Sequence, residues 1–157
     1  MTEENGKNCV HEQKDICSLH QLSNMKIIGI ARATLEFILK VSESSAPLEF
    51  AGLLRAEKGI IKDVIILPGT ESSDRNAVMK LFMMPNISSV GSVHSHPVPN
   101  IKPSKADLRL FGKTGTHHII VGAPYDENSW QCYDSDGQVQ ILPILEIELN
   151  ENGDILT

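Results

Sequence analysis

Residues 91–107 read Gly-Ser-Val-His-Ser-His-Pro-Val-Pro-Asn-Ile-Lys-Pro-Ser-Lys-Ala-Asp, and most of the chain's candidate chemistry lies within them. The apolar lead-in predicts a strand that runs into His94 and His96, whose i, i+2 spacing puts both imidazoles on one face. Three prolines then forbid regular strand pairing and predict a loop. Ser104 is the expected N-cap of a short helix, with Asp107 in its first turn.

Two neutral imidazoles and one carboxylate form the three-ligand pattern of catalytic zinc sites, in which water takes the fourth position. Such a water has its pKa lowered to about 7, so it attacks carbonyls at neutral pH and a hydrolase is predicted. Taken alone, each part also has a structural explanation. A His-x-His pair can end a strand, and Ser104 with Asp107 can form a capping box.

The spacing of these residues is specific. His94-Ser-His96, seven residues, Ser104, two residues and Asp107 together resemble the His-x-His-x7-Ser-x2-Asp signature of the JAMM (MPN+) metalloprotease family, in its compact prokaryotic form. The family also has an upstream glutamate in a Glu-x-x-Gly context, which Glu49-Phe-Ala-Gly52 matches. The resemblance covers residues 25–150.

The resemblance implies one catalytic Zn²⁺ held by His94, His96 and Asp107. It implies that Glu49 acts as general base and then acid, and that Ser104 donates a hydrogen bond to the developing oxyanion. The implied fold is a cytidine-deaminase-like MPN domain of the α+β (mixed α/β) class. One central, mostly antiparallel sheet would be flanked by an N-terminal helix and by the short helix that carries Asp107.

The residues by themselves leave the general base open. Glu36, Glu43, Glu49 and Glu57 are all acidic side chains upstream of the histidines. Without the resemblance, Glu49 is equally an ordinary polar residue at a strand edge, so all four stay candidates.

The resemblance also implies a substrate: the bond after the C-terminal Gly-Gly of a ubiquitin-like or sulfur-carrier protein conjugate. Three alternatives remain. Some relatives of this fold are non-catalytic interaction scaffolds, and two histidines with one carboxylate also describe the facial triad of non-haem iron oxygenases. A DNA-associated hydrolase with a similar loop is the third.

Composition limits the other possibilities. The chain has 157 residues, 41% of them apolar, which suits one globular domain with a core. Its net charge of -6 argues against a nucleic-acid binder, because phosphate contacts need a basic surface. No apolar run approaches a membrane span, and three cysteines have no disulfide framework spacing. We therefore expect a cytoplasmic protein with no membrane partner.

Residues 1–24 are polar and predict an extension without a core, residues 25–150 the catalytic domain, and residues 151–157 a tail. Within the extension, Cys9, His11, Cys17 and His20 could bind a second metal, although their spacing matches no common zinc module.

Periodicity predicts the remaining elements. A helix is expected over residues 31–44, with its buried face formed by Thr34, Leu35, Ile38, Leu39 and Ser42 or Val41. Strands are expected over 50–55, 60–67, 77–84, 116–121, 130–133, 138–141 and 142–149, and the helix after Asp107 is expected to end near Gly112. The adjacent His117 and His118 face opposite ways on a strand, so they are expected to be structural or surface residues.

Overall fold

The computed structural model describes residues 25–66 and 88–156, which form two helices and seven strands. In chain order these are β1 (Gly29–Ala31), α2 (Arg32–Ser45), β2 (Ala51–Glu57), β3 (Ile60–Ile66), β4 (Gly91–His96), α4 (Lys105–Thr114), β5 (His117–Gly122), β6 (Trp130–Tyr133) and β7 (Ile144–Leu145). Neither helix within these ranges is long and apolar enough to cross a membrane.

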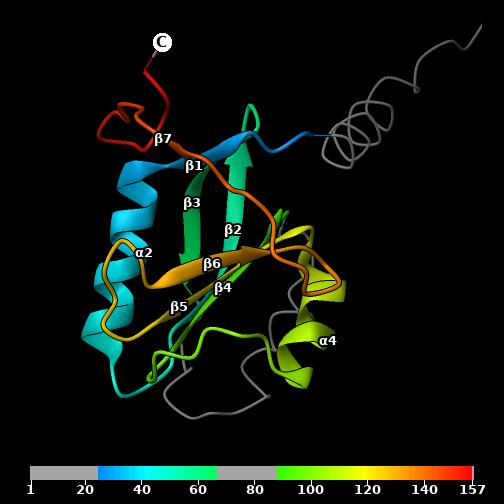
Figure 1. Ribbon diagram of the computed structural model, residues 1–157. Coiled ribbons are helices and arrows are strands. Elements are labelled where there is room, and N and C mark those ends of the chain that lie inside the picture. Colours follow the sequence, from blue (N-terminus) through cyan, green and yellow to red (C-terminus); the bar gives the residue numbers. More distant parts are fainter. Residues whose placement is uncertain (1–24, 67–87, 157) are drawn as a thin grey trace, which may run out of the picture.

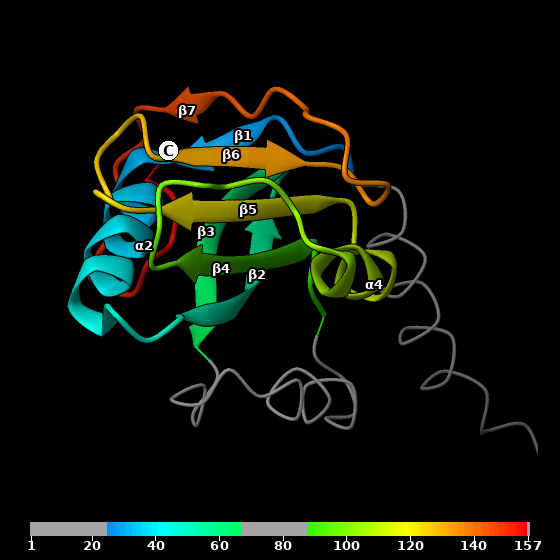
Figure 2. The ribbon, with the colours of Figure 1, turned by 60° about the horizontal axis from the view of Figure 1, so that its bottom comes forward.

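All seven strands belong to one curled sheet with the order β6-β5-β4-β2-β3-β1-β7 (Figures 1 and 2). The pairings β2–β3, β2–β4 and β5–β6 are antiparallel, and β4–β5, β1–β3 and β1–β7 are parallel. The α+β class and the single sheet are as predicted. The sheet is more mixed than expected, because the connection through α4 brings β5 back parallel to β4, and β1 pairs in parallel with both β3 and β7.

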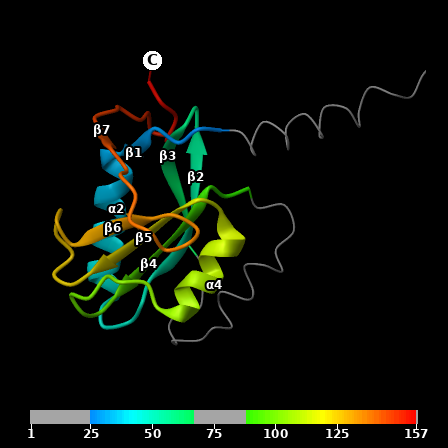
Figure 3. The ribbon, with the colours of Figure 1, turned by 45° about the vertical axis from the view of Figure 1, so that its right-hand side comes forward.

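The two helices lie on opposite faces of the sheet (Figure 3). Leu35, Ile38 and Leu39 of α2 pack against Ile119 and other residues of the main core. Alternate residues of β5 face the other way, so Ile120 joins Phe111 of α4 in a smaller cluster with Tyr133. The face of α2 predicted from periodicity is the buried one, with Ser42 buried and Val41 only partly so.

The predicted hairpin between β2 and β3 is present. Lys58 and Gly59 both have positive φ, 51° and 80°, which is the backbone of a two-residue type I′ turn. The partners Leu54 and Val64 in this hairpin belong to the central part of the sheet. The turn, together with a register shift between Arg55 and Ala56, therefore sets the register of β2, the strand that lies next to the histidine strand.

The C-terminal strands are shorter than predicted. Only Ile144–Leu145 form β7, and the expected strand over residues 138–141 contributes a single bridge between Val139 and Tyr133. Pro143 has no N–H to donate, which interrupts a continuous strand here. Helix α4 continues to Thr114, past Gly112. The strand predicted over residues 77–84 lies outside the described residues.

Gly91 begins β4 at a point where no side chain fits. A Cβ at this position would lie 1.5 Å from the backbone oxygen of His117 on the parallel neighbour β5. Backbone atoms paired in a sheet cannot move aside as a flexible side chain can. Glycine at this position therefore lets β4 and β5 approach closely enough to pair.

We expect Gly91→Ala to lower the free energy of unfolding by about 3 kcal/mol or more, because two backbones must separate. Gly112→Ala is the matched control: it adds the same methyl group at an exposed position of α4, where no atom outside the helix's own backbone lies within 4 Å of the new Cβ, and should raise stability by about 0.5–1 kcal/mol. Urea unfolding measures both. Equal stability of the two variants would contradict the close approach of β4 and β5.

Candidate metal centre

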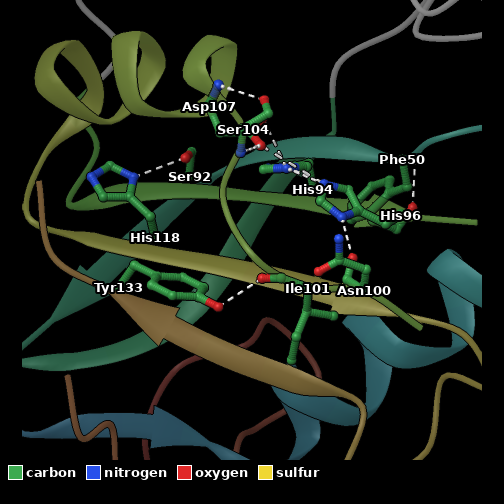
Figure 4. A network of polar contacts seen from close by, with 11 residues as sticks. Phe50, Ser92, His94, His96, Asn100, Ile101, Ser104, Asp107, His118 and Tyr133 are labelled. Atoms are coloured by element: carbon green, nitrogen blue, oxygen red, sulfur yellow. Dashed lines mark hydrogen bonds and ion pairs between the residues drawn. The ribbon is translucent and has the colours of Figure 1, made fainter. Parts of the chain in front are cut away.

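His94 and His96 lie at the end of β4 and point to the same side of the sheet, the side that α4 covers (Figure 4). Their Nε2 atoms are 3.1 Å apart, and their rings are tilted by 51°. Val93, between Ser92 and His94, points the other way into the main core and anchors the strand. The i, i+2 spacing of the two histidines therefore converges as predicted.

Asp107 enters from α4 and is held by the start of that helix. The Ser104 N–H donates to Asp107 Oδ2 at 2.6 Å, and the Asp107 N–H donates to Ser104 Oγ at 3.2 Å. This is a capping box, which satisfies two N–H groups at the helix end. The same contacts fix the carboxylate, so its other oxygen, Oδ1, lies 3.2 Å from His94 Nε2.

The three side chains are spaced as ligands of one metal ion. His96 Nε2 lies 3.8 Å from Asp107 Oδ2, and all the candidate ligand atoms lie within 4.8 Å of one another. Two atoms that are each about 2.0–2.1 Å from a tetrahedral zinc ion lie about 3.3 Å apart, which falls within the observed separations of 3.1–3.8 Å. The residues present therefore fit a zinc ion.

The tautomer of His96 also suits a metal ligand. Its Nδ1 lies 2.7 Å from the backbone oxygen of Asn100, and a carbonyl can only accept, so Nδ1 carries the proton. The lone pair of neutral His96 is then on Nε2, which faces His94 and Asp107. A backbone carbonyl on the second nitrogen is a common way to orient a metal-binding histidine.

Asp107 remains ionised at neutral pH. Burial raises the pKa of its carboxyl group, but the hydrogen bond and charge of His94 and the hydrogen bonds from Ser104 outweigh burial. The pKa of Asp107 is therefore held well below its usual range. Ionised carboxylate and neutral imidazole are the protonation states that bind metal.

Glu49 lies just before β2, and the register of β2 with β4 places it. Ala51 pairs with His94, while the Phe50 N–H donates to Ser95 Oγ and the Ser95 N–H to Phe50 O. Continued by one residue beyond Phe50 and Ser95, this register would put Glu49 opposite His96, on the face that both histidines share. Glu49 is exposed to solvent.

The other three candidate bases lie elsewhere. Glu36 and Glu43 belong to α2, on the opposite face of the sheet from α4. Glu57 ends β2 at the strand's far end and forms an ion pair with Lys62. Among the acidic residues that the sequence left open, Glu49 is the one whose strand position faces the histidines.

The Ser104 hydroxyl can act as a donor, and its hydrogen bond helps to keep the pKa of Asp107 low. Its Oγ accepts from the Asp107 N–H, and a hydroxyl that accepts can still donate its own O–H. Ser104 is exposed at the helix end beside Asp107. It can therefore donate to a group bound next to the metal ligands.

Sequence reasoning missed the contacts that support the site. The Asn100 carbonyl and the Ser95 hydroxyl carried no signal beyond their closeness to the histidines in the sequence. His117 and His118 are structural or surface residues as predicted: His118 is buried, and His117 is partly exposed beside Thr116. The Cys9, His11, Cys17 and His20 set lies outside the described residues.

A carboxylate at a capped helix end that faces two histidines at a strand end forms a donor set that fits the metal centre of a hydrolase. The sequence matches the Prok-JAB family, prokaryotic homologs of the JAB domain, over residues 31–133. It is 38% identical over 137 residues to a probable metalloprotease of Haloferax volcanii, covering 80% of this chain and 84% of that protein. The chain belongs to the JAMM (MPN+) metalloprotease family, in its prokaryotic JAB form.

Solved structures agree with this assignment. A structure described as "JAMM: A Metalloprotease-like Zinc Site in the Proteasome and Signalosome" is 37% identical, with a TM-score of 0.63, and covers 77% of this chain and 100% of that one. A JAB1/MPN domain protein of Archaeoglobus fulgidus is 39% identical, with a TM-score of 0.62, and covers 75% of this chain and 99% of that one.

We expect Asp107→Asn to weaken zinc binding by about 100-fold or more, because it removes the charged ligand and leaves the shape of the capping box. The wild type should gain about 2.7 kcal/mol of stability when free zinc is 100 times its dissociation constant, and Asp107→Asn should gain about 0.4 kcal/mol or less at that concentration. Asp136→Asn, at an exposed carboxylate in a turn, is the control. Thermal unfolding with and without zinc measures the gain, and equal gains in both variants would exclude Asp107 as a ligand.

Proposed function

We propose that this protein is a zinc-dependent isopeptidase that hydrolyses the bond after the C-terminal Gly-Gly of a ubiquitin-like or sulfur-carrier protein conjugate. The observation that carries the proposal is the convergence of His94, His96 and Asp107, with ligand atoms 3.1–3.8 Å apart. Membership of a metalloprotease family and likeness to a protein named for its zinc site support the choice of metal and reaction.

When bound, the zinc ion lowers the pKa of its coordinated water and polarises the carbonyl of the bond that is cleaved. Glu49 accepts the proton of the attacking water on a carboxylate oxygen and delivers it to the leaving amine. The Ser104 O–H donates to the oxygen of the scissile carbonyl as negative charge develops there. His94, His96 and Asp107 hold their positions through β4 and the capping box, so the site needs little rearrangement.

The low exposure of the three ligands favours a slender substrate. The side chains of His94, His96 and Asp107 are 9%, 16% and 15% exposed, so only a small part of each ligand can be reached from solvent. Glycine residues have no side chain and let a backbone approach closely. A flexible tail that ends in Gly-Gly satisfies both conditions.

The two other classes make different demands on the site. A non-catalytic scaffold has no use for this set of polar residues at all five positions, Glu49, His94, His96, Ser104 and Asp107. An iron oxygenase would use the same three ligands but would contain iron. Metal analysis of protein purified without chelator separates the three classes, since zinc supports the hydrolase, iron the oxygenase and no metal the scaffold.

We further propose that residues 25–150 form the catalytic domain, with residues 1–24 as an extension and 151–157 as a tail. The family match over residues 31–133 lies within these bounds. A cytoplasmic location is proposed for the protein, because Cys132 is a buried free thiol, in keeping with a reducing compartment.

We expect Glu49→Gln to retain zinc, because the three metal ligands are unchanged. Turnover of Gly-Gly-terminated fusions should fall by about 10²–10⁴-fold, because glutamine cannot transfer the proton. Glu43→Gln, on exposed α2, makes the same chemical change on the opposite face and should leave turnover unchanged. Cleavage assays with matched zinc content measure both. Turnover by Glu49→Gln at the rate of the control would eliminate Glu49 as the general base.

Ser104→Gly distinguishes the catalytic role of the Ser104 hydroxyl from the role of this residue as the N-cap of α4. Glycine keeps the backbone N–H that donates to Asp107 and is itself a tolerable N-cap, so the free energy of unfolding should fall by only about 0.3 kcal/mol. Turnover should fall by about 10²–10³-fold, because the donor to the developing oxyanion is lost. If turnover fell only as much as the small loss of stability explains, the hydroxyl would cap the helix and have no role in catalysis.

A further inference from the structure

His118 on β5 is buried completely, yet it belongs to none of the residues proposed to bind metal or substrate. Its two ring nitrogens have partners: Nδ1 lies 2.9 Å from Ser92 Oγ, and Nε2 lies 3.1 Å from the backbone oxygen of Gly115. Figure 4 shows this pair beside the metal site, below the helix that carries Asp107. A buried histidine with both nitrogens paired is held in one orientation.

The partners determine the tautomer of His118. The Gly115 carbonyl can only accept, so Nε2 carries the proton and donates it. Burial lowers the pKa of His118 to about 4, so the ring is neutral at pH 7 and Nδ1 has a lone pair. The Ser92 hydroxyl therefore donates to Nδ1.

One partner of His118 belongs to the histidine strand. Ser92 pairs with His118 across β4 and β5, and it precedes His94 by two residues on the same face of β4. His94 itself pairs with Ile120, two residues after His118. The ring of His118 is thus fixed to the strand that supplies His94 and His96.

The other contacts of His118 are with the helix that supplies Asp107. The ring of Phe111, four residues and about one turn after Asp107, stacks on His118 with centroids 4.1 Å apart and planes at 9°. The Gly115 oxygen that accepts from Nε2 is at the C-cap of α4. His118 therefore contacts α4 in its middle and at its end, while the capping box holds its start.

We propose that His118 is a positioning residue of the zinc centre: it fixes α4 to β4, and so sets the distance of Asp107 from His94 and His96. The inference rests on the ligand set of the proposed function. Asp107 is the ligand that α4 contributes and the two histidines belong to β4, so a shift of α4 moves the carboxylate and leaves the histidines in place. A merely space-filling residue would support the core without affecting this distance.

The test compares His118→Leu with Leu35→Ala. His118→Leu keeps an apolar side chain under Phe111 but removes both hydrogen bonds, and Leu35→Ala truncates a buried side chain of α2 on the opposite face of the sheet. Zinc affinity is measured by chelator competition at a temperature at which circular dichroism shows all proteins folded. Cobalt replaces zinc for the absorption spectrum, which reports ligand geometry.

We expect His118→Leu to bind zinc about 10–100-fold more weakly than the wild type and to change the cobalt spectrum. Leu35→Ala should match the wild type in both measurements. Ser92→Ala removes only the donor to Nδ1 and should weaken zinc binding by about tenfold; it replaces His118→Leu if that variant does not fold.

Wild-type zinc affinity and an unchanged cobalt spectrum in the His118 or Ser92 variant would overturn the positioning role alone. Equal losses in these variants and in Leu35→Ala would also overturn it, because the effect would then be one of general stability. Wild-type protein that bound neither zinc nor cobalt would overturn the ligand set itself. The failure of the proposed function is thus distinguishable from the failure of this inference.

Discussion

The meeting of α4 with the end of β4 is the constraint on which the site depends. β4 supplies two imidazoles at fixed spacing, and α4 supplies the carboxylate from its first turn. The capping box sets the carboxylate, because Asp107 both accepts from the Ser104 N–H and faces His94. A local interaction that begins a helix therefore also completes a metal centre, and α4 could not begin one residue later without moving the carboxylate.

The charge of Asp107 and the hydrogen bonds that orient the ligands both favour a cation at this junction. The ionised carboxylate faces two nitrogens, and their lone pairs would repel one another without a proton or a cation between them. Backbone groups fix the orientation from both sides, through the Asn100 carbonyl on His96 and the Ser104 N–H on Asp107. Such preorganisation reduces the rearrangement that metal binding requires.

Much of this was predictable from local pattern. The period-2 placement of His94 and His96, the Ser104 cap and the periodicity of α2 each depend on neighbours in the sequence. The position of Glu49 relative to the histidines cannot be predicted from neighbouring residues, because it depends on the register of β2 against β4. The spacing of Glu49 and Gly52 identified this glutamate only through the family resemblance. The role of His118 was equally hidden, because its partners Ser92, Phe111 and Gly115 come together only through the parallel pairing of β4 with β5.

X-ray absorption at the zinc edge of the full-length protein tests the central claim most directly, because it reports the atoms bound to the ion. The account predicts one zinc per chain with nitrogen and oxygen neighbours at about 2.0–2.1 Å, including the scattering pattern of two imidazoles. Sulfur neighbours at about 2.3 Å would place the ion at Cys9 or Cys17, and would contradict a centre built from His94, His96 and Asp107.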